Sequence, residues 1–380
     1  MKISRNLKIA AIATAIALFA AQPASAAEKL TGAGATFPIP LIDACKAGFA
    51  TDNPGSTFTY SGGGSGAGRT ASDNGIGDVN FSDSPHTAAS RLATVIHIPV
   101  VAAPIAVMYK LSSSKVLNLS PATVAGIFGG TITKWNDPAI VADNNRTTTV
   151  VNFKKDKDGQ VVKDKAGKPV VLNTRNVKSY YTLPNQKITV IYRSDKSGTS
   201  GNFTSFLHGM APAVWTKSGN DTFTNGFPGK LNDIANLGRI VGASGSAAVS
   251  ALAAKSPYSI TYAEKNYAAS NGLKVANIQN AAGNFQAPDA GGTAAFLGAA
   301  TVDANGILTF DYATKNAGAY PLGIVSYALV DTKTKKATEV KALLNYILNP
   351  KCPSTNPALE YTTITGPLLA VDVAQIAKIG

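Results

Sequence analysis

The chain has 380 residues, of which 45% are hydrophobic and 15% charged, and its formal charge at pH 7 is +13. This length predicts two domains of roughly 100–200 residues each, and the hydrophobic content excludes a wholly disordered chain. Two cysteines and three histidines exclude a disulfide-scaffold mini-protein and a cysteine-rich zinc module, so we expect no metal and no cofactor.

The N-terminus has the pattern of a secretory signal peptide over residues 1–26. Three basic residues precede an apolar run at residues 9–21, and residues 24–26 have the small-x-small pattern of a cleavage site. The apolar run is too short to span a bilayer of about 30 Å, although an uncleaved anchor is the alternative interpretation. We therefore expect an exported protein, soluble after cleavage, in the periplasm, the cell envelope or the extracellular space.

Export affects the interpretation of the two cysteines and of the charge. In an oxidising compartment Cys45 and Cys352 are expected to form a disulfide, which stabilises the fold by about 4–5 kcal/mol in the chain-entropy model. Two buried free thiols are the alternative. The basic charge indicates anionic partners. Lysines and arginines are spread along the chain without a stripe of interleaved aromatic residues, so we expect no nucleic acid among those partners.

Strands and helices alternate along the chain. Its first part is predicted to hold, in order, a strand at 29–31, a helix at 38–49, a strand at 57–60, a glycine loop at 61–68 followed by a helix, a strand at 79–82, one or two buried strands within 97–108, and a helix at 120–128. Its second part is predicted to hold a strand at 188–192, a helix from about 202, a small-residue loop at 241–246, a helix at 247–254, a strand at 323–330 and a helix at 338–347. This order is typical of an α/β fold with mixed, mostly parallel sheets.

Residues 154–168 carry six lysines and three aspartates around Asp158-Gly159 and Ala166-Gly167. We interpret this segment as a solvated β-hairpin insertion, because Asp-Gly pairs favour tight turns. A calcium loop is the alternative, but the aspartates lack the spacing and the terminal glutamate that such a loop needs. We expect the hairpin to lie outside any ligand site.

Three short loops rich in Gly, Ser and Thr each lie between a strand and a helix, at residues 34–37, 62–66 and 197–200. Such a loop directs unpaired backbone N–H groups and the positive end of a helix toward one point, and its small side chains let an anion approach the backbone. One loop of this kind is more often an ordinary helix cap. Three of them in an exported basic protein predict a binding site for an oxyanion.

Arg193 and Asp83 each stand at the end of a predicted strand and make the prediction more specific. The Arg193 guanidinium can bind two oxygens of an oxyanion. A carboxylate at Asp83 repels a bare oxyanion, and it is useful only if the ligand has a proton to donate. Phosphate has such a proton near neutral pH and sulfate has none, so Asp83 would select between them. The alternatives are that Asp83 caps a helix or pairs with Arg193.

These segments resemble the phosphate-binding proteins that serve the high-affinity phosphate ABC importer. The sequences TGAGATFPIP at 31–40, FSD at 81–83 and RSDKSGTS at 193–200 are similar to segments of that family in the same order, as are residues 127–140, 258–273 and 323–347. The resemblance covers most of the mature chain.

The resemblance implies two α/β lobes with a ligand cleft between them, in the manner of periplasmic binding proteins. Residues 27–106 and 318–380 would form lobe 1, and residues 107–317 would form lobe 2. The protein would be a monomer without enzymatic activity that captures inorganic phosphate and delivers it to a membrane permease. Asp83 would accept the phosphate proton, and Arg193 would pair with Asp83 or Asp195. The phosphate-binding residues that the resemblance implies are Thr36, Phe37, Ser65, Asp83, Arg193, Ser197, Gly198 and Thr199.

Several other functions are alternatives. A receptor for another tetrahedral oxyanion and a secreted phosphate-scavenging protein differ only in ligand or partner. An exported phosphatase needs a nucleophile with a base, or metals, and the sequence has no G-x-S-x-G motif and no acidic metal cluster. Residues 62–67 match the relaxed G-x-G-x-x-A pattern of dinucleotide-binding proteins, but the signal peptide argues against an intracellular cofactor.

Overall fold

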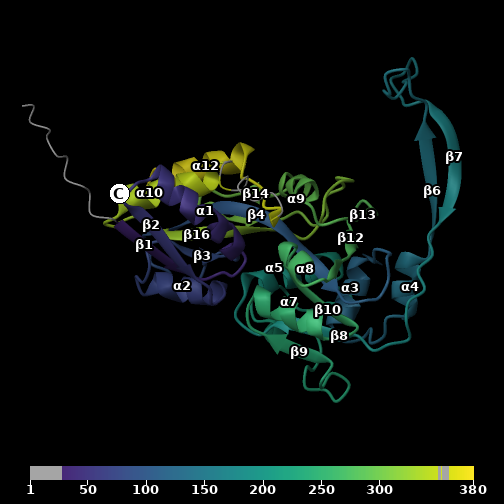
Figure 1. Ribbon diagram of the computed structural model, residues 1–380, viewed down its shortest axis with the longest axis horizontal. Coiled ribbons are helices and arrows are strands. Elements are labelled where there is room, and N and C mark those ends of the chain that lie inside the picture. The colour runs from purple at the N-terminus through teal and green to yellow at the C-terminus, as the bar shows by residue number, and fades with distance from the viewer. Residues whose placement is uncertain (1–27, 350–351, 353–358) are drawn as a thin grey trace, which may run out of the picture.

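A 15-residue strand, β4 (Val95–Tyr109), runs through the middle of the computed structural model, which describes residues 28–349, 352 and 359–380 (Figure 1). Its apolar sequence is buried along almost its whole length, as expected for a strand covered on both faces. Between Val95 and Pro104 it pairs antiparallel with β16 (Gly323–Asp331), and from Ile105 to Tyr109 it pairs antiparallel with β10 (Ser259–Glu264). The strand therefore changes its main partner between Pro104 and Ile105.

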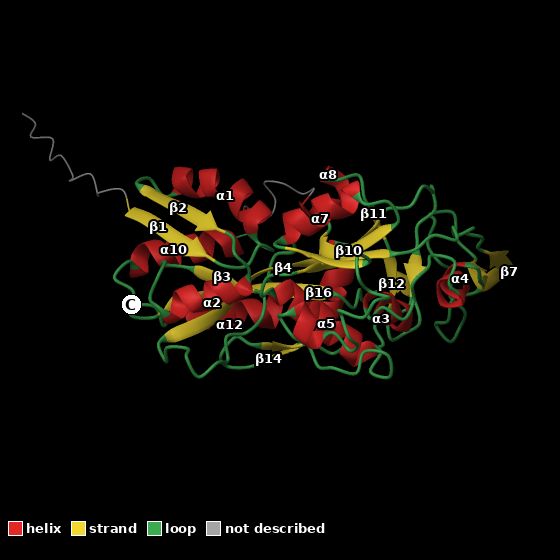
Figure 2. Cartoon of the chain, turned by 90° about the horizontal axis from the view of Figure 1, so that it is seen from below, coloured by secondary structure: helices red, strands yellow, loops and turns green. Residues whose placement is uncertain are grey.

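Two groups of elements lie on either side of this change of partner (Figures 1 and 2), and we call them lobe 1 and lobe 2. Lobe 1 contains β1 (Glu28–Ala33), α1 (Ile39–Asp52), β2 (Ser56–Ser61), α2 (Ser65–Asp73), β3 (Asn80–Ser82), α10 (Ala337–Leu348) and α12 (Gly366–Ile376). Lobe 2 contains α3 (Pro121–Phe128), α4 (Pro138–Asn144), β8 (Thr189–Arg193), α5 (Gly198–Met210), α6 (Phe223–Gly226), β9 (Ile240–Ala243), α7 (Ser246–Lys255) and α8 (Asn266–Ser270). The remaining short elements are β5 (Asn118–Leu119), β11 (Lys274–Val275), β12 (Asn277–Gln279), β13 (Phe285–Gln286), α9 (Ala290–Leu297), β14 (Thr301–Val302) and β15 (Leu308–Thr309).

The largest sheet has the strand order β3-β16-β4-β10-β8-β9, and β11 also pairs with β4. Strand β8 is parallel to β9 and β10, and β1 is parallel to β2. The long strands β4 and β16 are antiparallel to each other and to their other neighbours in this sheet. The predicted α/β class with mixed sheets is confirmed, but the expectation of mostly parallel sheets is wrong, because antiparallel strand pairs outnumber parallel ones in the described chain. The parallel pairs lie within the lobes, and the long antiparallel strands connect them.

Apolar packing and one covalent bond hold these elements together. In lobe 2, Phe203 stacks on Tyr262 with ring centroids 4.2 Å apart. In lobe 1, the apolar side of α10 is buried, as the spacing of its apolar residues predicts. A disulfide joins Cys45 on α1 to Cys352, and both residues are buried. It ties the N-terminal part of lobe 1 to the C-terminal part.

Most predicted elements occur near their expected positions, but three expectations are wrong. Helix α2 begins at Ser65, inside the expected glycine loop, and helix α5 begins at Gly198 and not at about 202. Of the loop expected at residues 241–246, the first three residues belong to β9. Small residues are typical of loops, but in both helices they permit close packing. A Cβ on Gly198 would lie 2.7 Å from Ser65 Oγ, and a Cβ on Gly66 would lie 2.7 Å from the Lys196 side chain.

The hairpin predicted at residues 154–168 is longer than expected. Strands β6 (Thr147–Phe153) and β7 (Val171–Lys178) pair antiparallel, and residues 154–170 form the tip beyond them. We call residues 147–178 the arm. It projects from the lobe 2 end of the molecule, away from the region where the lobes meet (Figure 1).

The predicted signal peptide, residues 1–26, lies outside the described residues. Within the described ranges, no helix combines the length and the hydropathy that spanning a bilayer requires.

Candidate functional site

The N-termini of helices from both lobes meet where the lobes touch. Helix α2 of lobe 1 begins at Ser65, and helices α5 and α7 of lobe 2 begin at Gly198 and Ser246. The Gly198 N–H donates to Ser65 Oγ over 3.0 Å, and the hydroxyls of Thr36 and Ser246 lie 3.1 Å apart. The positive ends of three helices, each of nine residues or more, are thus directed at one place. Such an arrangement favours an anion.

Ser65 is a hydrogen-bond donor by necessity. Its Oγ accepts from the backbone N–H of Asp83 and from that of Gly198, both over 3.0 Å, and the residue is fully buried. These two bonds occupy the lone pairs of the hydroxyl oxygen. The hydroxyl proton is therefore left to point to a third group, and Asp83 Oδ2 lies 3.4 Å away.

Asp83 is a buried carboxyl group between the lobes. Ser326 Oγ of β16 donates to its Oδ1 over 2.8 Å, and the hydroxyl of Thr199 lies 3.5 Å from its Oδ2. Burial raises the pKa of Asp83 to about 7, and the negative charge of Glu264 adds to the rise against the opposing effects of Ser326 and Arg193. The carboxyl group can therefore change its protonation state near neutral pH.

Arg193, at the end of β8, is held by Asp195. Its Nε donates to Asp195 Oδ1 over 2.7 Å and its Nη2 to Asp195 Oδ2 over 2.5 Å, a bidentate pair. The Gly245 N–H also donates to Asp195, over 2.9 Å. Burial acts to lower the pKa of Arg193, but the hydrogen bonds and charge of Asp195 outweigh it and raise that pKa. The pair thus neutralises much of the charge of Arg193 while fixing its orientation.

The second terminal nitrogen of Arg193 points away from Asp195 and into the site. Its Nη1 donates to Ser246 Oγ over 3.0 Å and lies 3.5 Å from Thr199 Oγ1. Arg193 is 1% exposed, so this N–H group faces the interior. It is available to an oxyanion that displaces either hydroxyl.

The loop before α1 supplies backbone donors. Within the described part of the chain, the N–H groups of Thr36 and Phe37 donate to no other protein group. The neighbouring carbonyls are held in place: Tyr60 donates to the Ala35 carbonyl over 2.7 Å, and Tyr361 donates to the Phe37 carbonyl over 2.5 Å. The two N–H groups are therefore fixed in orientation.

All eight predicted site residues lie in this region of contact between the lobes. Hydrogen bonds connect Thr36, Ser65, Asp83, Arg193, Gly198 and Thr199, directly or through Ser246. Ser197 is the N-cap of α5, since its Oγ accepts from the Ser200 N–H over 3.3 Å. Of the two partners expected for Arg193, the side chain hydrogen bonds to Asp195 and not to Asp83.

Two residues of the network were not predicted from the sequence. Ser246 connects Thr36 with Arg193 and donates from its Oγ to Glu264 Oε1 over 3.2 Å. Glu264 is 1% exposed, and its Oε2 has no hydrogen-bond partner in the described chain. Burial raises the pKa of Glu264, against the effect of Arg193. The one signal for Glu264 in the sequence is an acidic residue at the end of an apolar strand.

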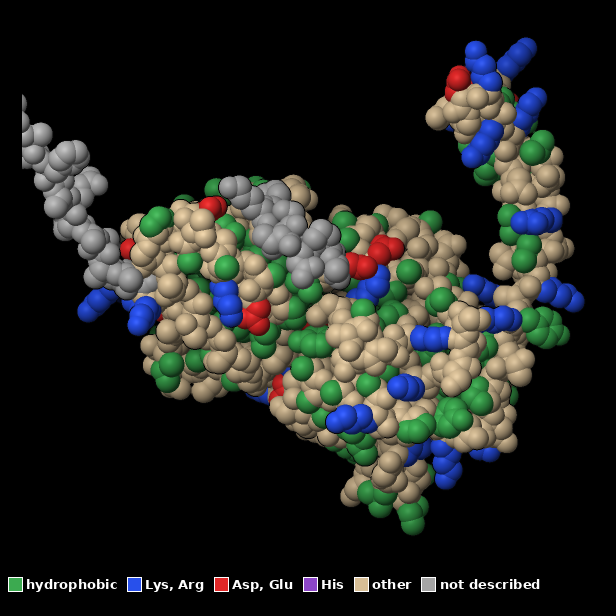
Figure 3. Space-filling view, viewed as in Figure 1, with side chains coloured by type: hydrophobic (Ala, Val, Ile, Leu, Met, Phe, Trp, Pro, Cys, Tyr) green, Lys and Arg blue, Asp and Glu red, His purple; other side chains and the backbone are tan. Residues whose placement is uncertain are grey.

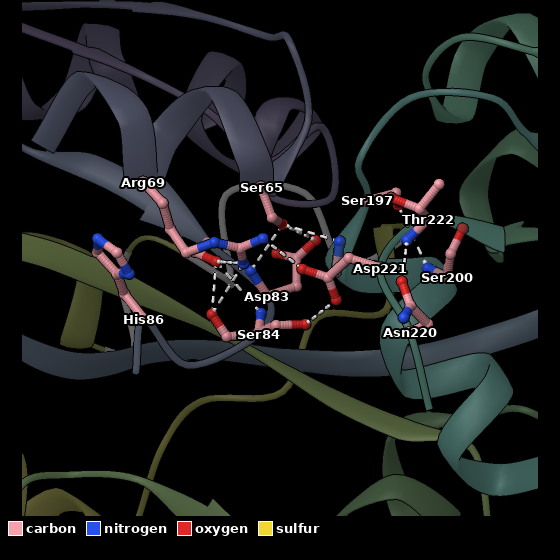
Figure 4. A network of polar contacts seen from close by, with 12 residues as sticks. Ser65, Arg69, Asp83, Ser84, His86, Ser197, Ser200, Asn220, Asp221 and Thr222 are labelled. Carbon is pink, nitrogen blue, oxygen red and sulfur yellow. Dashed lines mark hydrogen bonds and ion pairs between the residues drawn. The ribbon is translucent and has the colours of Figure 1, made fainter. Parts of the chain in front are cut away.

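A second polar cluster joins the lobes beside Asp83 (Figure 4). Arg69 on α2 forms an ion pair with Asp221 of lobe 2, and Ser84 Oγ donates to Asp221 Oδ1 over 2.7 Å. The Asn202 amide donates to the Asp83 carbonyl over 2.7 Å. A cavity of about 430 Å³, lined in part by Asp83, Asn202 and Asp221, lies beside this cluster. These contacts connect residues of lobe 1 with residues of lobe 2.

A family profile and the most similar relatives that we found agree on one family for this chain. A profile of the PBP superfamily domain matches residues 20–351. The chain is 33% identical to phosphate-binding protein PstS 3 of Mycobacterium tuberculosis over 307 residues, which is 77% of this chain and 70% of that protein. It is 32% identical to PstS 2 of the same organism over 317 residues, or 78% of this chain and 73% of that protein.

Solved structures show the same fold. A phosphate-binding protein from Stenotrophomonas maltophilia superposes with a TM-score of 0.59 at 18% identity, covering 92% of this chain and 93% of that one. The profile covers most of the chain, and the mycobacterial relatives share about a third of their aligned residues with it over more than two thirds of their length. The chain therefore belongs to the PstS phosphate-binding proteins of the PBP superfamily.

Proposed function

We propose that this chain is an extracytoplasmic solute-binding protein that captures inorganic phosphate and delivers it to an ABC-type phosphate permease. The observation that carries the proposal is the meeting of helix N-termini, fixed hydroxyl groups and the neutralised Arg193–Asp195 pair around one buried carboxyl group. The relatives that bear the name phosphate-binding protein support the same assignment.

In this proposal phosphate replaces the protein's own contacts in the network. The N–H groups of Thr36 and Phe37 and the hydroxyl of Ser65 donate to phosphate oxygens. Ser197, Gly198 and Thr199 in the first turn of α5 close the cage: the hydroxyls of Ser197 and Thr199 face the ligand, while the Gly198 N–H stays on Ser65 Oγ and keeps Ser65 a donor. Arg193 donates from Nη1. Because these donors are fixed before the ligand arrives, little ordering is needed on binding.

Asp83 selects the ligand. In its ionised form it accepts the proton of a phosphate P–OH group, whereas sulfate has no proton to give and would place an oxygen against a buried negative charge. A site built around such a hydrogen bond rejects the analogue that cannot make it. The selection therefore depends on ligand protonation and not on ligand size.

Closure of two lobes buries the ligand. We propose lobe boundaries at residues 27–106 and 318–380 for lobe 1 and 107–317 for lobe 2, which agree with the change of partner along β4. Exclusion of water strengthens each hydrogen bond inside the closed site. We further propose that the protein is exported, acts as a monomer, needs no cofactor and performs no chemistry on phosphate.

The test is a calorimetric titration of the mature protein, residues 27–380, with phosphate, arsenate, sulfate and molybdate. We expect phosphate to bind with a dissociation constant in the micromolar range or lower, arsenate to compete because it also carries a proton, and sulfate and molybdate to compete poorly. Sulfate binding as tight as phosphate binding would contradict the proposal and favour a general oxyanion receptor. Turnover of a phosphate ester by the purified protein would favour a phosphatase.

A further inference from the structure

The arm, residues 147–178, is the part of the protein that the phosphate site does not explain. It is an antiparallel pair of strands that extends from the body (Figure 3), and every residue of β7 is exposed. A two-stranded hairpin is marginally stable when nothing covers it. An exposed hairpin of this kind is expected to be stabilised by contact with a binding partner.

The arm is strongly basic. It holds eight basic and three acidic residues, a net charge of +5, and six of its lysines lie in the tip at residues 154–168. Two of the aspartates build the turns: Asp156 Oδ1 accepts from the N–H groups of Asp158 and Gln160, and Asp164 Oδ1 accepts from those of Ala166 and Lys168. None of the arm's lysines forms an ion pair within the described chain. Asp156 and Asp164 thus stabilise the turns, whereas the positive charges of the arm's lysines are not paired with a carboxylate of the described chain.

The arm also exposes apolar side chains beside its lysines. Phe153 is 40% exposed and Leu172 is 62% exposed, both next to the tip. Six of the fourteen large apolar residues that are exposed in the described chain lie on this one hairpin. Apolar groups in such numbers on a projection from the body indicate a surface that is buried in use.

We propose that the arm binds the surface of an anionic phospholipid bilayer. Lysines attract anionic headgroups, and the interfacial zone of a bilayer also accepts apolar side chains. A soluble polyanion would match the lysines but leave the apolar side chains in water, so the combination favours the bilayer. Since the arm points away from the region where the lobes meet, such contact leaves the ligand site free. The proposal is independent of the identity of the ligand.

The test uses the mature protein in co-sedimentation with phosphatidylglycerol/phosphatidylcholine vesicles and with vesicles of phosphatidylcholine alone. The arm variant replaces the six tip lysines by glutamine and keeps the turn-forming Asp and Gly residues. A matched variant replaces six exposed lysines of the body by glutamine, namely Lys115, Lys187, Lys230, Lys255, Lys333 and Lys335. The two variants have the same net charge. Phosphate titration and thermal unfolding of each variant serve as controls for folding.

We expect the unmodified protein and the body variant to bind anionic vesicles and to lose binding as salt rises. Each Lys near an anionic surface contributes roughly fivefold. Contact by only two of the six tip lysines then gives about 25-fold, so the arm variant should bind at least about 25-fold more weakly while its phosphate affinity is unchanged. The proposal is overturned if the unmodified protein does not bind anionic vesicles at low salt, or if the arm variant and the body variant lose the same amount of binding. Binding to heparin without binding to vesicles would also overturn it and would point to a soluble polyanion.

Discussion

Replacing Asp221 by alanine removes the lobe 2 partner of Arg69 and should weaken phosphate binding without unfolding the protein. The side chains of Arg69 and Asp221 are 10% and 14% exposed, so the pair is largely shielded from water. Asp221 also accepts from Ser84 on the lobe 1 side. Both contacts are made across the lobes, and they therefore stabilise the closed form and not the open one.

The size of the effect follows from this geometry. Truncating one partner of a buried charge pair costs about 2–5 kcal/mol. The lower value applies here, because Arg69 keeps its hydrogen bond to Ser82 Oγ, and in an open form its guanidinium would regain water. A loss of about 2 kcal/mol from the closed, ligand-bound form raises the dissociation constant about thirtyfold.

Isothermal titration calorimetry with phosphate measures that constant, and stopped-flow fluorescence shows whether the loss lies in the dissociation rate. The matched control is Asp43→Ala, which removes the Asp43–Lys46 ion pair on α1, whose side chains are 58% and 52% exposed. It should change the affinity less than about twofold. An unchanged dissociation constant for Asp221→Ala, or an equal change in the control, would refute the role of this pair in closure.

Three further results are expected. At pH 6, phosphate binding should release close to one more proton from the unmodified protein than from Asp83→Asn. In the empty site Asp83 is protonated below its pKa of about 7, and the bound state needs it ionised. Calorimetry in buffers of different ionisation enthalpy measures the number of protons released, and the difference between the two proteins should vanish above pH 8. Replacing Cys45 and Cys352 together by alanine should lower the free energy of unfolding by about 4 kcal/mol in urea titrations, with phosphate affinity unchanged, since neither residue is part of the site network. Burial raises the pKa of Asp372 to about 8, so the folded state binds more protons than the unfolded state between about pH 4 and 8, and stability falls as pH rises through that window. Asp372→Asn should flatten this decline by more than about 1 kcal/mol between pH 5 and 8, and an unchanged pH profile would show that Asp372 is ionised in the folded protein.

The sequence predicted the elements whose signals are local. The apolar spacing of α10, the Ser-Pro start of α3 and the apolar run of β4 each determine a helix or strand through neighbouring residues. The starts of α2 and α5 were missed because their small residues serve contacts with the opposite lobe, at Lys196 and Ser65, that are far away in the sequence. Local patterns do not contain such contacts.

The residues of the candidate site also fall into two groups, those with a local sequence signal and those without one. The loops at Thr36, Ser65 and Thr199 have a recognisable composition, and Asp195 lies two residues from Arg193. Glu264 and Asp221 have no such signature, because each acquires its place through contacts with residues 18 and 152 positions away. Burial of their charges is a property of the folded chain and cannot be predicted from a short motif.

The ratio of sulfate to phosphate dissociation constants, measured by calorimetry at pH 8 for the unmodified protein and for Asp83→Asn, tests the role of Asp83 most directly. At this pH Asp83 is mostly ionised in the empty site. We predict that the amide, which carries no charge and can itself donate, lowers that ratio by at least about tenfold, mainly by tightening sulfate binding. An equal ratio in both proteins would contradict the account, because discrimination would then arise from groups other than this carboxylate.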